Sequence, residues 1–238
     1  MTMKSVNVLL LGGLALAGAA QAQDGGSTWG GEAELGIVST DGNTETQTIA
    51  AKAKAVNDRD KWKHEVGLEA LNAESNDQTT AEKYLLTGKT NYKLSARDYV
   101  FGVATYEDDR FSGYDWRATE AVGYGRHVIA EETLQLDLEA GLGARQSERD
   151  DGTDEDEGLV RLYGLLGWDI SETSRFTEEL LSEIGEDVTI SKSVTGLKSQ
   201  INGALAMKIT YTVKHVSEVP AGVEKVDRET AVTLVYSY

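Results

Sequence analysis

The segment Leu134-Gln135-Leu136-Asp137-Leu138-Glu139-Ala140-Gly141-Leu142-Gly143-Ala144-Arg145 decides the fold class. Its apolar side chains recur at every second position, and polar or charged residues occupy most of the positions between them. A β-strand points successive side chains to opposite faces, whereas a helix would scatter these leucines around its circumference. The segment is therefore predicted to be a long strand with one apolar face and one polar face.

The same alternation runs through most of the chain after the first 28 residues. It predicts roughly twelve strands, at about 29–40, 45–56, 61–71, 80–94, 99–106, 116–128, 133–146, 158–170, 175–185, 188–200, 204–216 and 228–238. Segment 116–128 has no assignable faces, because both of its registers carry charged residues. Most of these strands are longer than those of soluble domains and match the length that crosses a bilayer at a tilt.

The connections support the same architecture. Turns of a few residues, such as 57–60 and 95–98, alternate with longer polar segments at 72–79, 107–115, 146–157 and 217–227. Two short connections, 41–44 and 185–187, depart from this rule. Short and long connections alternate in a barrel whose two ends face different compartments. The prediction is an all-β, antiparallel, up-and-down transmembrane β-barrel of about twelve strands over residues 23–238. The alternative is a periplasmic β-sandwich or a lipocalin-like barrel.

Aromatic residues test the barrel independently. With Trp29 at the inner end of the first strand, one rim collects Trp29, Trp62, Tyr92, Tyr99, Trp168, Phe176, Tyr236 and Tyr238. Aromatic belts form where a membrane meets water, because an amphipathic ring is stabilised there. The sequence therefore predicts that this end of the barrel lies at a membrane interface.

Residues 1–22 are predicted to be a cleaved signal peptide. Lys4 precedes an apolar run from Val6 to Ala17, and Ala20-Gln21-Ala22 is a cleavage site of small residues. The run is too short to span a bilayer as a helix. No cysteine follows it, so a lipid anchor is not expected. The predicted location is the outer membrane.

Composition narrows the classes of function. The 238 residues carry 40 Asp and Glu against 23 Lys and Arg, a formal net charge of −17, and no Cys. This charge repels phosphate, so nucleic acid is not an expected partner. The absence of Cys excludes disulfides and a cysteine-ligated zinc site.

The C-terminus Thr230-Ala231-Val232-Thr233-Leu234-Val235-Tyr236-Ser237-Tyr238 resembles the last strand of bacterial outer-membrane barrels. That resemblance implies recognition by the barrel assembly machinery through Tyr236 and Tyr238, and a setting of outer-membrane lipid and lipopolysaccharide. Further motifs, including the opening segment 29–36, Asp41-Gly42-Asn43-Thr44, the segment 106–115 and the segment 219–227, resemble a narrower family. It is the family of salt-induced outer-membrane proteins of Gram-negative bacteria. The family has no assigned activity, so the resemblance implies location, fold and a link to salt.

One acidic run is a weak candidate for binding divalent cations. Within the segment 148–157 the candidates are Asp150, Asp151, Asp154, Glu155, Asp156 and Glu157. Carboxylate oxygens are the ligands that Ca²⁺ and Mg²⁺ take, but the spacing does not fit an EF-hand. A solvated loop is the favoured interpretation, and no dedicated metal or cofactor site is predicted.

Catalytic signals are weak. His215 and Ser217 share a strand face and weakly resemble the pair of outer-membrane phospholipases. Such a pair needs a third group to orient the His, and Asn202 lies at the other end of the strand. The protein is therefore not predicted to be an enzyme, and a lipid hydrolase is a distant alternative.

The inward register suggests the function. Expected inward residues are Glu32, Glu34, Lys52, Lys54, Lys61, Lys63, Glu65, Glu69, Lys83, Lys89, Lys93, Asp137, Glu139, Arg161, Arg175, Glu179, Glu183, Lys208 and Lys214. These charges either line a channel for small hydrophilic solutes or pair across strands and fill the interior. The sequence slightly favours a closed or narrow barrel that serves envelope integrity or osmotic adaptation. A passive porin-like channel is the alternative.

Overall fold

Twelve long strands make up the protein. The computed structural model describes residues 28–41, 46–75, 78–220 and 222–237, so the predicted signal segment lies outside the described residues. The strands are β1 (Thr28–Asp41), β2 (Thr46–Asp58), β3 (Trp62–Ser75), β4 (Gln78–Lys93), β5 (Asp98–Asp109), β6 (Tyr114–Ala130), β7 (Leu134–Arg149), β8 (Asp154–Ser171), β9 (Ser174–Gly185), β10 (Thr189–Gln200), β11 (Leu205–Val216) and β12 (Val226–Ser237). Among these residues no helix is long and apolar enough to cross a bilayer.

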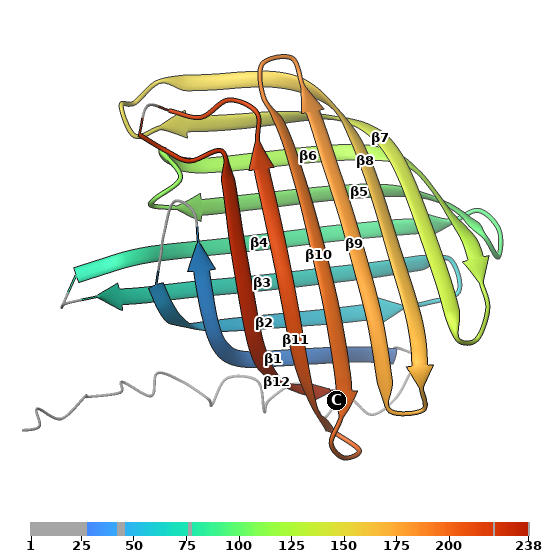
Figure 1. The fold of residues 1–238 in the computed structure, drawn as a ribbon. Coiled ribbons are helices and arrows are strands. Elements are labelled where there is room, and N and C mark those ends of the chain that lie inside the picture. Colours follow the sequence, from blue (N-terminus) through green and yellow to red (C-terminus); the bar gives the residue numbers. More distant parts are fainter. Residues whose placement is uncertain (1–27, 42–45, 76–77, 221, 238) are drawn as a thin grey trace, which may run out of the picture.

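The strands form one closed antiparallel barrel in which every strand pairs with its sequence neighbours. Closure is made by β1 and β12, which pair from Glu32↔Ser237 to Asp41↔Arg228. A closed sheet leaves no unpaired edge, which is what lipid demands of a spanning β-structure. The wall of β9–β12 crosses the wall of β1–β5 steeply (Figure 1). The prediction of a twelve-stranded, up-and-down barrel is confirmed.

We call the end of the barrel that holds Thr28 and Ser237 the inner rim, and the opposite end the outer rim. At the outer rim the strands run further than the sequence indicated, and the predicted long loops are mostly strand. β3 extends to Ser75, β5 to Asp109 and β7 to Arg149. The expectation of loops at 72–79, 107–115 and 146–157 was therefore wrong in extent. Strands that extend above a membrane carry polar side chains, and their sequences therefore resemble those of loops. Among the outer-rim connections that the structure describes, the one between β11 and β12 remains long.

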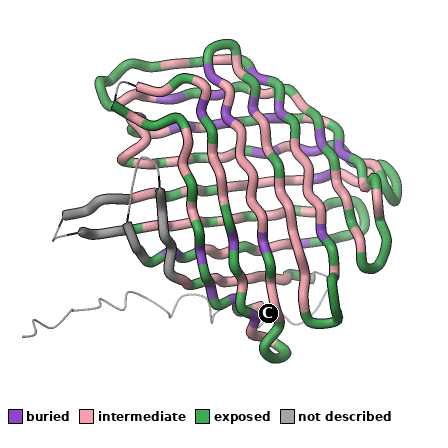
Figure 2. The backbone as a smooth tube through the Cα atoms, viewed as in Figure 1, coloured by how far each residue is buried: buried purple, intermediate pink, exposed green. Residues whose placement is uncertain are grey.

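Side chains alternate between the lumen and the outer surface. Along β7, Leu138 and Leu142 are exposed on the outer surface, while Glu139 and Arg145 are buried in the lumen. Figure 2 shows exposed and less exposed positions alternating along most strands. The structure also assigns the faces of β6, since Arg117, Thr119 and Ala121 are buried and Val122 is exposed.

The aromatic belt at the inner rim is largely present. Trp29, Trp62, Trp168 and Tyr236 are exposed on the outer surface, and Trp62 packs edge-on against Tyr92 with ring centroids 4.9 Å apart. Tyr99 was wrongly placed in this belt. It lies in the inward register of β5, is buried, and donates a hydrogen bond to Glu139.

Candidate functional site: the barrel lumen

The lumen has two walls of different character. We call the inward side chains of β4–β8 around Glu139 the arginine wall: Lys89, Tyr99, Phe101, Glu139, Arg145, Arg161 and Tyr163. We call the inward side chains of β1–β3 with β10 and β11 the lysine wall: Glu32, Glu34, Lys52, Lys54, Glu65, Glu69, Lys198 and Lys208. The two walls are built from the same alternation but differ in how tightly they pack.

Glu139 is the centre of the arginine wall. Its Oε1 accepts hydrogen bonds from Lys89 Nζ at 2.5 Å and from the Tyr99 hydroxyl at 2.8 Å. Its Oε2 accepts one from Arg161 Nη1 at 3.1 Å. The Glu139 side chain is only 1% exposed. Its charge is therefore compensated by two cations and a hydroxyl rather than by water.

Aromatic rings surround these cations. The Lys89 ammonium lies 5.0 Å from the centre of the Tyr163 ring, and the Arg161 guanidinium lies 5.6 Å from that of Phe101. Cations over ring faces are stabilised by the ring quadrupole, most strongly where water is excluded. The aromatic rings and charged groups together fill this side of the lumen.

Glycine on β6 makes room for this packing. A Cβ on Gly125 would lie 2.3 Å from ring atoms of Tyr99. Tyr99 can lie flat against the barrel wall only because residue 125 has no side chain. Gly125 thus allows an aromatic side chain to pack in the lumen.

Arg145 extends the same wall towards the outer rim. Its guanidinium donates to Glu157 Oε1 at 2.5 Å and to the Val188 carbonyl at 2.6 Å, and its Nη1 lies 3.6 Å from Glu183. The side chain is 2% exposed. The planar guanidinium ties β7 to β8, β9 and the β9–β10 turn in a way that a single ammonium could not.

The charged side chains of the lysine wall form ion pairs but remain accessible to water. Lys52 lies 2.8 Å from Glu69, and Lys54 lies 2.6 Å from Glu65. The Lys54 side chain is 55% exposed and that of Glu69 is 40% exposed, although both point into a closed barrel. Water-sized space therefore runs along this side of the lumen.

Side-chain exposure falls towards the middle of the lysine wall. Glu32, towards the inner rim, is 40% exposed and pairs with Lys198. One pleat further along β1, Glu34 is only 10% exposed, and it accepts hydrogen bonds from Lys208 at 2.8 Å and Thr233 at 3.2 Å. The pair of Glu34 and Lys208 is therefore less accessible to water than the pair of Glu32 and Lys198.

An ion pair crosses the barrel nearer the outer rim. Lys214 on β11 donates to Glu107 on β5 at 2.8 Å. Five strands lie between β5 and β11 in either direction round the barrel, so this ion pair spans the lumen. Glu107 also lies 3.2 Å from Lys83 and 3.8 Å from Arg117.

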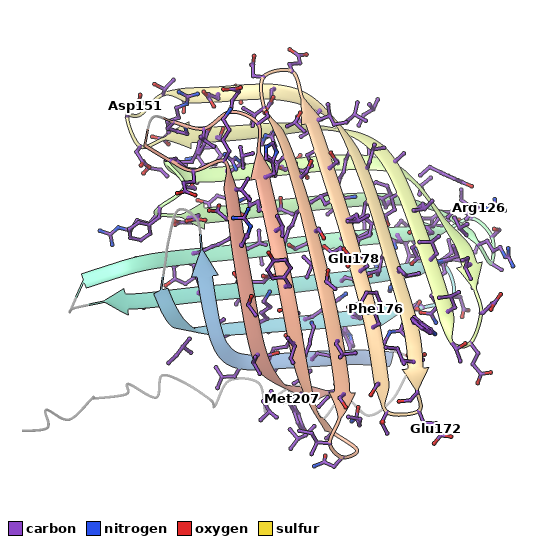
Figure 3. The ribbon with its side chains drawn as sticks, in the orientation of Figure 1. Arg126, Asp151, Glu172, Phe176, Glu178 and Met207 are labelled. Carbon is purple, nitrogen blue, oxygen red and sulfur yellow. The ribbon has the colours of Figure 1, made fainter. Side chains whose placement is uncertain are left out.

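The acidic run predicted as a cation site is divided between two faces and a turn. Within β8, Asp154 and Asp156 are exposed, whereas Glu155 pairs with Arg149 and Glu157 with Arg145. Asp150 and Asp151 lie in the turn. Asp151 is at the end of the barrel opposite Arg126 (Figure 3). Hydrogen bonds from Thr153 hold the pKa of Asp151 below its ordinary value. In the described residues no group of three or more His, Asp or Glu is arranged to hold a metal ion. Weak attraction of divalent cations stays a prediction.

The proposed nucleophile pair is not assembled. His215 is exposed at the outer end of β11, and the Ser217 hydroxyl accepts a hydrogen bond from the Thr189 N–H at 2.9 Å. No hydrogen bond joins His215 to Ser217 in the described part of the chain. The other two histidines are held differently, His64 by Thr90 at 2.9 Å and His127 by Asp137 at 2.6 Å.

Several lumen charges were missing from the predicted inward set. They are Glu107, Arg117, Arg145, Lys192, Lys198 and Glu229. Glu107 was expected in a loop, and Arg117 lies in the segment whose faces were unassigned. Lys192 and Lys198 lie on β10, where serine and threonine replace the apolar residues that reveal a register. The apolar residues of β10 fall in both registers, so the sequence carried no signal that could have found these two lysines.

Glu178 is a charged residue on the outer surface of the barrel. Glu178 on β9 pairs directly with Leu166 and Thr195, which share the outward face (Figure 3). Its two carboxylate oxygens accept hydrogen bonds from Ser193 at 2.7 Å and Thr195 at 2.6 Å. These two hydrogen bonds replace the hydration that a carboxylate loses when it faces lipid.

Solved structures share this architecture. The NanC porin superposes with a TM-score of 0.59 at 11% identity, covering 86% of this chain and 98% of that one. The KdgM porin in complex with disordered oligogalacturonate gives 0.51 at 12% identity, over 87% and 99%. An outer-membrane channel from Pseudomonas putida F1 gives 0.52 at 10%, over 93% and 98%. The fold is therefore that of outer-membrane porins and channels.

Sequence comparison gives the family. An uncharacterised protein of Escherichia coli K12, YdiY, is 29% identical over 208 residues, which is 87% of this chain and 82% of that protein. The family model described as a protein of unknown function, DUF481, matches residues 33–238. The chain belongs to the DUF481 family.

Proposed function

We propose that the protein is a narrow, passive, non-enzymatic channel for small hydrophilic solutes in the outer membrane. The observation that carries the proposal is the exposure of paired charges inside the closed barrel. Lys54, Glu32 and Glu69 remain 40–55% exposed, whereas Glu139 and Arg145 on the other wall are 1–2% exposed. Solutes would pass along the lysine wall only.

The charges of the lysine wall suit small solutes of either sign or none. On β1–β3 neighbouring strands carry opposite charges, as in Lys54 beside Glu65. On β10 and β11 the lysines Lys198 and Lys208 pair with carboxylates of β1. Such a lining replaces part of a solute's hydration without strongly favouring cations or anions. The fold shared with porins and channels supports the proposal.

A closed structural barrel is the second candidate. The Lys214–Glu107 bridge favours it, because an ion pair that spans the lumen blocks large solutes. In that case the protein would strengthen the envelope, and its resemblance to salt-induced proteins would supply the osmotic setting. Export through residues 1–22, and insertion by the barrel assembly machinery through Tyr236 and Tyr238, belong to both candidates.

Conductance across a planar bilayer tests the proposal. The protein without residues 1–22, refolded and shown to be folded by its heat-modifiable gel mobility, is expected to give small, stable unitary currents. Glu34 is the least exposed carboxylate of the lysine wall. If the channel is narrowest there, Glu34→Ala is expected to raise the unitary conductance about twofold. Folded protein that gives no unitary current would favour the closed barrel instead.

A further inference from the structure

The outer half of the lumen holds a cavity of about 210 Å³. It is lined by β2–β6 and β9–β12, and its charged lining includes Lys52, Glu69, Glu107, Lys192 and Glu229. A cavity in which a few charged groups converge is the usual form of a small-molecule site. The arrangement of these charges indicates what such a molecule would carry.

Most charges around the cavity are committed to each other. Lys52 pairs with Glu69 at 2.8 Å. Glu107 accepts from Lys214 and lies within 4.0 Å of Lys83 and Arg117. These side chains satisfy one another without a ligand.

Lys192 is a cation of the cavity lining that has no ion-pair partner among the described residues. It lies directly opposite Lys214 in the β10–β11 ladder, and like charges in that position repel. Lys214 escapes this repulsion by reaching across the lumen to Glu107. Among the described residues, none forms an ion pair or a hydrogen bond with the Lys192 ammonium, and its field acts on Glu69, which Lys52 already holds.

Glu229 is an acidic residue of the cavity lining that likewise has no ion-pair partner in the described parts of the chain. It points inward from β12, opposite Thr212, and lines the same cavity. No ion pair within 4.0 Å involves it in the parts of the chain that the structure describes, although its field acts on Lys52. The sign of its charge is opposite to that of Lys192.

The two groups are close enough to share a ligand. Only β11 separates β10 from β12, so their backbones lie about 10 Å apart. Lys192 and Glu229 are offset by one pleat along the strands, since Lys192 aligns with Lys214 and Glu229 with Thr212. A molecule with a carboxylate and an ammonium group would bridge the two side chains and add no net charge.

We infer that this cavity binds small zwitterions of the amino-acid or betaine class, with the anionic group on Lys192 and the cationic group on Glu229. The inference rests on the proposed channel and names its preferred solutes. A net anion would meet Glu229 and Glu69, and a net cation would meet Lys192, so the site discriminates against both.

Two measurements test the inference separately from the channel. The first is the swelling of liposomes that contain the refolded protein, in isosmotic serine or in erythritol, a neutral molecule of similar size. Serine is expected to enter about fivefold faster than erythritol, because each weak, hydrated ion pair contributes a small free energy. Lys192→Met and Glu229→Gln are each expected to remove this preference. Lys61→Met, an exposed residue in the turn before β3, is the control and should leave it unchanged.

The second measurement is saturation-transfer NMR of serine with the protein in detergent. Binding by the wild type that is lost in Lys192→Met and in Glu229→Gln supports the site. Erythritol entry with no serine preference and no serine binding would overturn the inference and leave the channel standing. Serine binding without entry of either solute would support the site and contradict the channel.

Discussion

The arginine wall and the lysine wall of the lumen contain the same types of charged residue but differ in how far water reaches them. Each contains a carboxylate held by two cations: Glu139 by Lys89 and Arg161, and Glu65 by Lys54 and Lys63. Around Glu139 aromatic rings and a buried guanidinium exclude water, whereas around Glu65 one of the two lysines is more than half exposed. The sign and number of charges therefore do not decide whether a barrel interior is filled or passable. The side chains that surround the charged groups decide whether the interior is filled.

The comparison predicts a large difference between two identical substitutions. Glu139→Gln leaves two buried cations without their shared counter-ion, and we expect it to lower the free energy of unfolding by about 3–5 kcal/mol. Glu65→Gln, the matched control on the lysine wall, is expected to cost about 1 kcal/mol or less, because water can solvate Lys54. Urea titration in lipid vesicles, followed by tryptophan fluorescence, measures both. Equal losses would mean that the walls do not differ as described.

A smaller effect should follow from filling the space behind Tyr99. Gly125→Ala places a Cβ 2.3 Å from the Tyr99 ring, so the ring must move and loosen its hydrogen bond to Glu139. We expect a loss of about 1–3 kcal/mol, as for other overpacked sites. Gly67→Ala, on β3 of the lysine wall, meets no atom closer than 3.8 Å and should be nearly neutral in the same titration. A neutral Gly125→Ala would show that the arginine wall is not tightly packed.

The smallest effect concerns salt. A double-mutant cycle on Lys54 and Glu65 should give a coupling of a few tenths of a kcal/mol at low salt that fades towards zero in 1 M salt. The coupling of Arg161 with Glu139 should persist, since screening ions do not reach a side chain that is 1% exposed. Salt sensitivity of the second pair equal to that of the first would place water in the arginine wall.

The sequence predicted more of the fold than of the lumen. Period-two alternation in segments such as 134–145 is enough to give the strand number, the faces of most strands and the closed topology, because lipid requires an apolar outer face. It cannot tell whether neighbouring inward charges are wet. That depends on Gly125 and Tyr99 meeting from adjacent strands, and on Lys214 reaching a strand on the far side. Alternation also fails on β10, where Ser191, Ser193 and Thr195 leave the register unmarked.

The seam between β1 and β12 has a consequence for how the chain is assembled. Glu32 accepts a hydrogen bond from Ser237, 205 positions later, and Glu34 accepts one from Thr233, 199 positions later. Contacts this distant in sequence form slowly, because the loop between them must be closed first. Until they form, the sheet of twelve strands has two open edges, β1 and β12, which are templates for aggregation. We therefore expect that this chain needs an assembly factor to cover the two edges of the sheet until the barrel closes.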